Sequence, residues 1–555
     1  MELIQFISIY SILTLSIIGY GFLFSCYFTK FNNINLSNIS IGYIGLFGVF
    51  FLTFISYSTN IILAHSNYHN LIIHLIGIVS FLFFFKKNYK KISLKYFFLA
   101  YLISFFAIFY FKSHDDFSYY HFSFIENITR NKIEFGLGHF DTAFNHVSSL
   151  FYFHSLFKTT LTSHFFYQIG QLSIAIFVNT ILFENIFVKK KSSKLDITFY
   201  LSIFCIFFIN IFFYRLAEHG TDRSAQILFF LCIILIISIF KNTKYLDEIL
   251  EKLLIIFTLI VSIKSFYLLY SLILLIIYFK FYKVNYLFNF FKKFNVTKIC
   301  IAMLIFIMIY SMSHSGCFLY PVSFTCPSTF FWGYEKEKIL GFMNWYELWS
   351  KAGATPNFRV DDISHYLKGL NWVPNWIDTY FFNKILDFIS GILFMMFIIL
   401  LFFKPKKLSF KGFGKFFIIY ILLMILFLEW FFNHPSLRYG GYVLIFLLIT
   451  IPISILLENQ NFKFSEKFSS IKIIFLIGIF IFAGRNINRL NNEYKIYNYT
   501  FYKNPYYRIQ DKFFYMQNTK GKLFKKPDYC ERKNIQSNLN CIKKNSYNFY
   551  YFIDN

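Results

Sequence analysis

Long apolar runs recur along most of this 555-residue chain, and they restrict its possible folds more than any other feature. A membrane-spanning helix needs about 20 mainly apolar residues, because the hydrocarbon core of a bilayer is roughly 30 Å thick. Within that core every backbone amide and carbonyl must be paired inside the protein, which favours helices. The runs therefore predict an all-α polytopic membrane protein with about 14 transmembrane helices. The expected spans are residues 4–27, 40–63, 70–85, 96–111, 165–188, 196–214, 223–240, 253–263, 266–279, 297–312, 384–403, 416–432, 440–457 and 470–484.

Composition and charge placement agree with this class and indicate an orientation. With 57% hydrophobic and 15% charged residues, the chain does not resemble a soluble globular protein. Short Lys-rich loops usually face the cytoplasm, so the +26 net charge predicts contact with cytosol and membrane lipids rather than a nucleic-acid partner. The lysine clusters lie within residues 86–95, 189–194, 280–298 and 404–415.

With these clusters inside, the chain divides into six regions. They are the N-terminal transmembrane helices (1–111), an outer loop (112–164), the central transmembrane helices (165–312), an outer loop domain (313–383), the C-terminal transmembrane helices (384–484) and a small outer tail (485–555). The outer loop at 112–164 contains an acidic motif and an expected amphipathic surface helix around residues 147–157.

Residues 253–279 have lysines at both ends, so we expect two short spans that form a hairpin with Lys264 at its outer turn.

This orientation also predicts that five polar segments share the outer face. The cytoplasmic loops are short and contain neither a phosphate-binding loop nor a dinucleotide fingerprint, so direct use of cytosolic ATP is not expected. The converging segments are residues 112–154, 216–223, Lys264, 313–383 and 433–441.

Asp115 and Asp116 follow an apolar run directly and are the first candidates for chemistry. A carboxylate at the outer end of a span can act as a general base, and a pair of them can bind a divalent cation such as Mg or Mn, although the chemistry does not require a metal. The alternative is a helix-end pair that only solvates the loop. His121, His139 and Asn145 follow as further candidates, but the histidines lack the adjacent-turn spacing of a helical metal site.

Two cationic positions are candidates for binding an anion, and a polar turn supplies two further candidate site residues. Lys264 interrupts a nearly uncharged stretch, and Arg438 lies at the outer entry of a span, so both are predicted to bind a phosphate group. Asp222 and Arg223 occupy a polar turn between two apolar spans. The alternatives are that Lys264 snorkels, that Arg438 anchors the interface and that Asp222 and Arg223 cap a helix.

The outer segments also contain paired cysteines and several tryptophans. We predict that Cys317 pairs with Cys326 and Cys530 with Cys541, because each pair is close in sequence and on the oxidising side. A zinc site made by both pairs is the competing interpretation. The tryptophans of residues 313–383 suit either anchoring at the membrane interface or stacking on carbohydrate.

The segment Asp115-Asp116-Phe117-Ser118-Tyr119-Tyr120-His121 resembles the first outer loop of the GT-C superfamily, integral-membrane glycosyltransferases with polyprenyl-phosphate sugar donors. HGTDRSAQ at 219–226, Gly-x-x-Leu-Tyr-Pro at 316–321 and RYG at 438–440 resemble a multi-span bacterial family associated with surface polysaccharide. The resemblance implies a bacterial inner-membrane enzyme with a periplasmic active face. It also implies that Asp115 or Asp116 is the base, and that the substrates are a polyprenyl-phosphate sugar and a cell-envelope glycan or lipid-linked acceptor.

Two other functions fit the same composition. An O-antigen polymerase or ligase also has many spans and a large late outer loop, and its key Arg and His residues would lie in residues 313–383. A transporter or flippase of lipid-linked sugars would place ionisable residues at mid-membrane depth and often shows internal repeats. The charges here gather at one face instead, which favours the glycosyltransferase.

Overall fold

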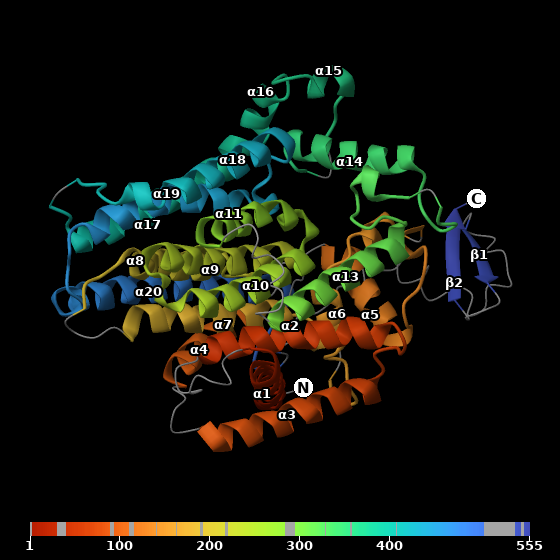
Figure 1. Cartoon of the computed structure of the whole chain (residues 1–555), viewed down its shortest axis with the longest axis horizontal. Coiled ribbons are helices and arrows are strands. Elements are labelled where there is room, and N and C mark those ends of the chain that lie inside the picture. Colours follow the sequence, from red (N-terminus) through yellow and green to blue (C-terminus); the bar gives the residue numbers. More distant parts are fainter. Residues whose placement is uncertain are drawn as a thin grey trace.

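A computed structural model describes most of the chain, which forms a bundle of mainly apolar helices (Figure 1). The described residues are 3–29, 40–88, 94–109, 116–139, 141–162, 164–188, 193–216, 220–282, 295–327, 329–355, 358–406, 408–503, 505, 539–544 and 549–554.

Nearly all regular elements in this part of the chain are helices, and one short antiparallel strand pair, which the all-α prediction did not include, lies near the C-terminus. The bounds are α1 (Leu3–Phe28), α2 (Ile41–Asn60), α3 (Asn67–Asn88), α4 (Lys95–Ile108), α5 (Phe122–Arg130), α6 (Ser149–Ser155), α7 (Ile169–Phe187), α8 (Ile197–Phe212), α9 (Thr221–Lys241), α10 (Leu246–Ile263), α11 (Leu272–Phe281), α13 (Asn295–Ser315), α14 (Lys336–Lys351), α15 (Ile363–Leu367), α16 (Val373–Trp376), α17 (Leu386–Phe403), α18 (Phe417–Asn433), α19 (Gly441–Glu458), α20 (Phe464–Tyr497), β1 (Leu539–Lys544) and β2 (Phe549–Asp554).

The helical class and the membrane-spanning character are confirmed at a coarse level. Among the described residues, nine helices are long and apolar enough to cross a membrane. Four further apolar helices are shorter: α4, α8, α18 and the segment Ser265–Phe281. Every expected span coincides with a helix, whereas the total of about 14 crossings stays a prediction.

Glycines allow the N-terminal helices to pack backbone to backbone. A Cβ at Gly21 would lie 1.8 Å from the carbonyl oxygen of Ile44 on α2, and a Cβ at Gly48 would lie 1.9 Å from that of Ile17 on α1. Small residues permit this close helix approach within membranes. α7 packs on α2, α4, α8 and α9 and lies at the centre of the bundle.

The predicted hairpin within residues 253–279 is present. α10 ends at Lys264, and a 3-10 helix, η9 (Ser265–Ser271), leads into α11. The Tyr282 hydroxyl after α11 donates to Asp247 Oδ1 at the start of α10, at 3.0 Å. The two arms are therefore antiparallel, with Lys264 at the turn.

The expected amphipathic surface helix around residues 147–157 is wrong. α6 has only seven residues and all of them are buried, against α2, α5, α7 and α10. The helix also bonds to its neighbours inside the protein, as where Ser56 Oγ donates to the Tyr152 carbonyl at 2.5 Å. The segment is therefore a short helix inside the bundle, surrounded by α2, α5, α7 and α10.

Two expected boundaries also shift. The last residues assigned to the outer loop domain belong to a helix, since α16 and a π-helix, η12 (Ile377–Ile385), run directly into α17. α20 continues to Tyr497, so the first part of the expected tail at 485–555 extends a membrane-spanning helix.

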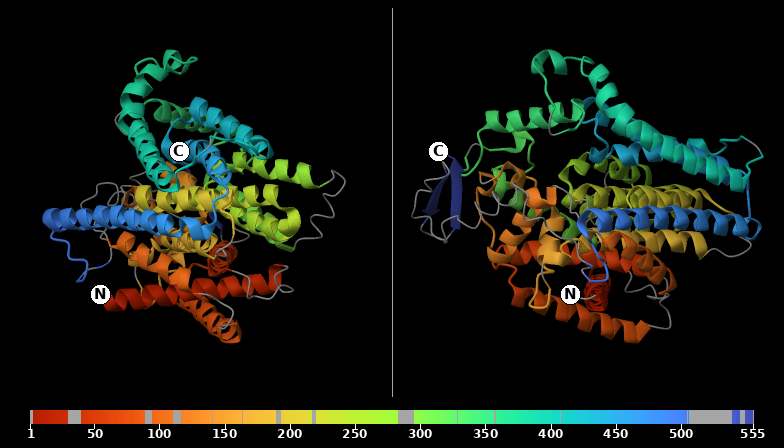
Figure 2. Two further views of the ribbon diagram at one scale, coloured as in Figure 1. Left: turned by 90° about the vertical axis from the view of Figure 1, so that its left-hand side faces the viewer. Right: turned by 180° about the vertical axis from the view of Figure 1, so that it is seen from behind.

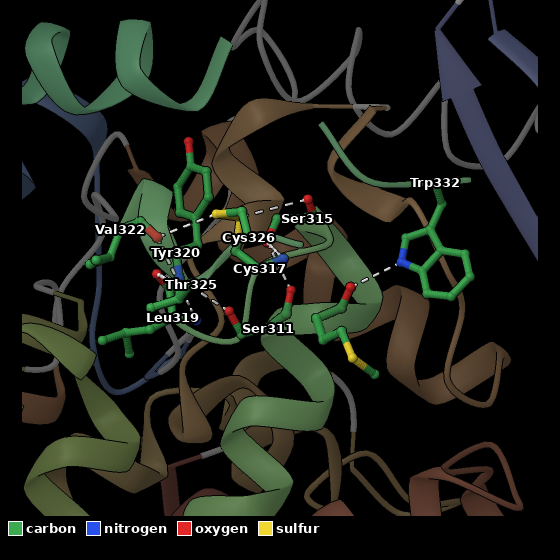
Figure 3. Close-up of a disulfide and its surroundings, with 10 residues drawn as sticks. Ser311, Ser315, Cys317, Leu319, Tyr320, Val322, Thr325, Cys326 and Trp332 are labelled. Carbon is green, nitrogen blue, oxygen red and sulfur yellow. Dashed lines mark hydrogen bonds between the residues drawn. A yellow bond between two sulfur atoms is a disulfide. The ribbon is translucent and has the colours of Figure 1, made fainter. Parts of the chain in front are cut away.

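The Cys317–Cys326 disulfide is confirmed, and it closes a compact turn after α13 (Figure 3). Thr325 Oγ1 donates to the Leu319 carbonyl at 3.0 Å within this turn. Trp332 Nε1 donates to the Met312 carbonyl on α13 at 3.0 Å, which ties the following segment back to the helix. Cys530 lies outside the described residues, so its predicted pairing with Cys541 of β1 stays a prediction.

Candidate functional site

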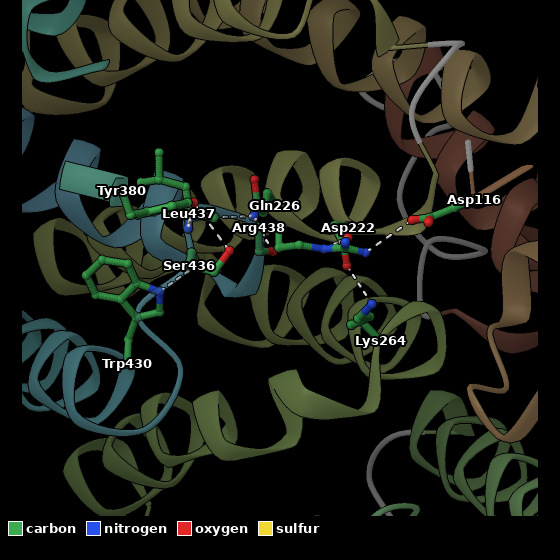
Figure 4. A network of polar contacts seen from close by, with 9 residues as sticks. All are labelled: Asp116, Asp222, Gln226, Lys264, Tyr380, Trp430, Ser436, Leu437 and Arg438. Atoms are coloured by element: carbon green, nitrogen blue, oxygen red, sulfur yellow. Dashed lines mark hydrogen bonds and ion pairs between the residues drawn. The ribbon is translucent and has the colours of Figure 1, made fainter. Parts of the chain in front are cut away.

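Four charged side chains from distant parts of the sequence meet at one end of the bundle (Figure 4). Lys264 Nζ lies 2.6 Å from Asp222 Oδ1, and Arg438 Nε lies 3.1 Å from Asp222 Oδ2. Arg438 Nη2 also reaches Asp116 Oδ2 at 3.4 Å. We call Asp116, Asp222, Lys264 and Arg438 the charged cluster.

Helix ends position these four residues. Asp222 lies in the first turn of α9, where the helix dipole favours an anion, and Lys264 is the C-cap of α10, where it favours a cation. Asp116 precedes η3 (Phe117–His121), and Arg438 lies in the short helix η14 (Leu437–Tyr439) before α19. The cluster therefore joins the start of α9, the end of α10 and the segment before α19.

The segment that carries Arg438 is held by polar side chains from neighbouring helices. Gln226 Nε2 on α9 donates to the Arg438 carbonyl at 3.0 Å. Tyr380 Oη accepts the Leu437 amide at 2.8 Å, and Trp430 Nε1 donates to the Ser436 carbonyl at 2.8 Å. Buried donors and acceptors of this kind fix the backbone, so the position of Arg438 is built into the fold.

Gly440 is needed immediately after Arg438. Its φ is +100°, a left-handed conformation that disfavours a side chain. A Cβ there would also lie 2.3 Å from the Tyr270 hydroxyl of η9. The glycine thus allows the Arg438 segment to approach the α10–α11 turn, which holds Lys264.

The charged cluster is partly open to solvent and formally neutral. Asp222 is the least exposed, at 16%, and Arg438 the most, at 35%. Because Asp222 contacts both cations, it is the centre of the cluster. The Arg438–Asp116 contact is the longest of the three, so it is the one that an incoming anion displaces most easily.

Aromatic side chains from the outer loop domain and from η14 line the cluster. The Arg438 guanidinium lies 5.6 Å from the ring centre of Trp349 on α14 and 5.7 Å from that of Tyr439. Tyr346, one turn before Trp349, has its hydroxyl 2.6 Å from His146 Nε2. α14 therefore brings the outer loop domain onto the cluster.

His146 is kept neutral at this position. Burial lowers its pKa most, Lys264 and Arg438 lower it further, and Asp222 and Asp116 only partly oppose them, so the pKa of His146 falls to about 3. The 112–154 segment lies at the cluster, because Asp116 within it contacts Arg438. The prediction that five polar segments converge is thus confirmed, whereas the side of the membrane on which they lie stays a prediction.

The remaining predicted site residues lie around the cluster rather than in it. His139 Nε2 donates to the Trp332 carbonyl at 2.9 Å, and Asn145 Nδ2 donates to Tyr334 Oη at 3.4 Å, so both bind the outer loop domain. His121 lies beside Gly220, where a Cβ would be 2.5 Å from its ring. Arg223 lies 4.8 Å from the ring centre of Phe213. Asp115 lies outside the described residues, so only Asp116 of the acidic pair can be placed.

The described residues contain no group of three or more His, Cys, Asp and Glu side chains that could hold a metal ion. In the charged cluster both visible carboxylates contact cations. A divalent cation would therefore have to compete with Lys264 and Arg438 for Asp116 and Asp222.

Three aromatic residues at the site were not predicted individually: Tyr346, Trp349 and Tyr439. Tyr346 and Trp349 are three residues apart on α14 and so share a helix face, a signal present in the sequence. Tyr439 follows Arg438 directly and contacts Trp349, with ring centres 6.0 Å apart. What the sequence lacked was the packing of α14 over the start of α19.

The comparisons with known proteins give one match. A family model described as "Domain of unknown function (DUF8201)" matches residues 1–446, a range that contains the whole charged cluster. No curated protein and no solved structure matches the chain. Because the match covers most of the sequence, the chain belongs to the DUF8201 family.

Proposed function

We propose that this protein is a membrane glycosyltransferase of the GT-C type. It transfers a sugar from a polyprenyl-phosphate donor to a cell-envelope glycan or lipid-linked acceptor, at the periplasmic face of the bacterial inner membrane. The observation that carries the proposal is the contact between Arg438 and Asp116, 322 residues apart, beside Lys264 at the ends of apolar helices. The contact supports the proposal because a carboxylate that could act as the base lies next to two cations that could bind the donor phosphate.

The proposed reaction assigns each charge a step. An acceptor hydroxyl attacks the anomeric carbon of the donor sugar and loses its proton to the carboxylate of Asp116 or Asp115. The bond between that carbon and the phosphate oxygen breaks, and the phosphate leaves with the electron pair. Arg438 and Lys264 stabilise the charge that develops on the leaving phosphate.

The observed ion pairs couple binding to catalysis in this scheme. Arg438 lies between the two aspartates, so a donor phosphate that contacts Arg438 competes with Asp116 for its guanidinium. Release of Asp116 strengthens it as a base, because a carboxylate beside a cation holds a proton less well. Asp222 contacts both cations and keeps them oriented.

The aromatic residues supply a surface for the sugar. Trp349 of the outer loop domain and Tyr439 of η14 both lie near the Arg438 guanidinium, at 5.6 Å and 5.7 Å from their ring centres. Aromatic rings in this position suit the apolar faces of a pyranose. We therefore assign the interface between α14 and η14 to the transferred sugar.

The test uses the full chain reconstituted in lipid with radiolabelled polyprenyl-phosphate sugars. Transfer to envelope acceptors or to water is compared among wild type, Asp116→Asn, Asp115→Asn and Arg438→Lys. Asp362→Asn is the matched control, because Asp362 is exposed and caps α15, and Asn caps a helix equally well. We expect loss of a general base to slow turnover about 10²–10⁴-fold in one aspartate variant. The thermal unfolding of that variant should stay close to that of wild type.

Three results would contradict this assignment. Full activity in both aspartate variants, with activity lost on substitution of His or Arg in residues 313–383, would support a polymerase or ligase instead. Donor-dependent flux in vesicles without turnover would identify a transporter. No transfer with any polyprenyl-phosphate sugar would remove the proposed substrate class.

A further inference from the structure

A groove on the flank of the bundle has the form of a lipid site. It has a volume of about 550 Å³ and lies between α8, α17, α19 and α20. That volume falls within the range of about 300–1,000 Å³ that is usual for ligand pockets. Phe394 on its rim is 59% exposed, so the groove opens sideways to the surroundings of the bundle.

The two helices that form most of its walls are antiparallel. Lys467 Nζ near the start of α20 donates to the Phe403 carbonyl at the end of α17, at 2.7 Å. The other ends, Lys384 just before α17 and Arg485 within α20, therefore lie at the same level. α17 and α20 contact each other, and the right-hand view of Figure 2 shows α17 (teal) running obliquely above α20 (blue) and meeting it towards one end of the bundle.

The groove is polar at one end and apolar along the rest. Lys384, Asp387, Asn383 and Arg485 line it at the end nearer the charged cluster. From there to Ile399, fifteen residues along α17 span about 22 Å, longer than the roughly 15 Å of one hydrocarbon leaflet. The lining over that length is aliphatic and aromatic, so the groove accommodates one hydrocarbon chain with its head group at the polar end.

Arg485 is held in position at the mouth. Its Nη1 donates to the Ile211 carbonyl at the end of α8, at 2.8 Å, and its guanidinium lies 4.2 Å from the ring centre of Tyr214. A guanidinium has five donors, so others can still contact an anion. With Lys384 positive and Asp387 negative, the mouth has a formal charge of +1, which matches the single negative charge of a phosphodiester.

The groove is separate from the charged cluster. Tyr442 and Phe388 line it, and their ring centres are 4.9 Å apart. The ring centres of Tyr442 and Phe213 are 5.6 Å apart. The Arg223 guanidinium lies over the other neighbour in this chain of contacts, the Phe213 ring. This aromatic layer lies between the groove and the first turn of α9, which holds Asp222 and Arg223.

We propose that the groove binds an anionic membrane phospholipid, with an acyl chain along α17 and α20 and the phosphodiester between Lys384 and Arg485. A basic pocket between membrane helices is a recognised arrangement for anionic head groups. This inference goes beyond the proposed glycosyl transfer and does not depend on it, because binding is measured without turnover.

The test measures lipid binding to the full chain in detergent by native mass spectrometry, with phosphatidylglycerol, phosphatidylcholine and undecaprenyl phosphate. Each cation near an anionic lipid contributes about 1 kcal/mol, so loss of both should weaken phosphatidylglycerol binding about 30-fold. The double variant Lys384→Gln/Arg485→Gln is compared with Lys411→Gln/Lys415→Gln, which removes the same charge at exposed sites outside the groove.

Two further variants keep the test decisive if the Arg485 change disturbs folding. Lys384 is exposed, and Lys384→Gln alone should weaken binding about fivefold. Ile477→Trp fills the apolar part and should reduce binding of phosphatidylglycerol and phosphatidylcholine alike. Equal loss in the control pair, no preference for phosphatidylglycerol over phosphatidylcholine, or tighter binding of undecaprenyl phosphate would each overturn the proposal.

Discussion

At the scale of single residues, Asp222 is the anion on which the charged cluster depends. It contacts Lys264 and Arg438, whereas Asp116 contacts only Arg438 among these cations and at a longer distance. Removing one partner of a partly buried charge network leaves the opposite charges without compensation. The two aspartates should therefore differ in what they do for stability.

We expect Asp222→Asn to reduce the free energy of unfolding by about 1–3 kcal/mol, because it leaves two neighbouring cations with a neutral partner. Asp116→Asn, at a more exposed residue, should cost less than about 1 kcal/mol. Thermal or denaturant unfolding of the purified protein measures both, with Asp362→Asn as the exposed control. Equal effects of the two substitutions would show that Asp222 is not the centre of the cluster.

His146 gives the cluster a pH dependence whose sign can be worked out. The pKa of an unfolded histidine is about 6.5, and the pKa of His146 in the fold is about 3. Protonation therefore favours the unfolded chain. The contribution of neutral His146 to stability is complete above pH 6.5 and is lost as the pH falls towards 3.

We expect His146→Gln to make the stability of the protein less sensitive to acid between about pH 6.5 and pH 4, by up to about 1 kcal/mol per pH unit. The measurement is unfolding at a series of pH values. Other buried histidines are present in both proteins, so the difference between the two curves isolates His146. Parallel curves would contradict the shift.

At the scale of elements, the sequence predicts helices well because each apolar run is local information. All expected spans fall on helices, and the break at Lys264 marks a real turn. The α6 segment shows the limit. Its apolar residues fit a surface helix and a buried one equally, and only the helices around it decide between them.

The candidate site was predictable to a similar extent. Charges at helix ends identified Asp222, Lys264 and Arg438, because each interrupts an apolar stretch. Their mutual contacts were not predictable, since Arg438 and Asp222 are 216 residues apart. The aromatic lining by Trp349 depends on how α14 packs, which no local pattern encodes.

Gly440 allows a test of the turn that presents Arg438. Gly440→Ala meets both a left-handed backbone and the Tyr270 hydroxyl, whereas Gly412→Ala meets only the left-handed backbone, at φ +90° with open space around it. We expect Gly412→Ala to cost about 1 kcal/mol and Gly440→Ala at least about 1 kcal/mol more, from unfolding measurements. Equal costs would mean that η14 does not rely on this approach to η9.

At the scale of the whole molecule, the disulfide turn and the charged cluster lie at the same end of the bundle. Tyr320, beside Cys317, has its ring centre 5.3 Å from that of His146, whose neighbour Tyr346 lies one turn before Trp349. Disulfides persist in oxidising compartments. The compartment that forms this bond is therefore the one from which the cluster is reached.

We expect Cys317 and Cys326 to be linked in protein taken from cells under thiol-blocking conditions, as read by non-reducing peptide mass spectrometry. Buried Cys205 and Cys232, in α8 and α9, serve as internal controls that stay reduced. Cys326→Ser should cost roughly 2–3 kcal/mol by removing the cross-link. Reduced Cys317 and Cys326 in fresh cells would place this end of the bundle in the cytosol.

The long sequence separation within the charged cluster also bears on how the protein is made. The ribosome delivers Asp222 and Lys264 to the membrane well before Arg438, which follows Asp222 by 216 residues. Until the segment before α19 is made, the other three residues of the cluster lack Arg438, and the turn at Lys264 lacks the Gly440 segment that packs against it. A chain that stops before Arg438 therefore leaves Asp222 and Lys264 at the ends of α9 and α10 without the guanidinium that also contacts Asp222 and Asp116 in the full chain.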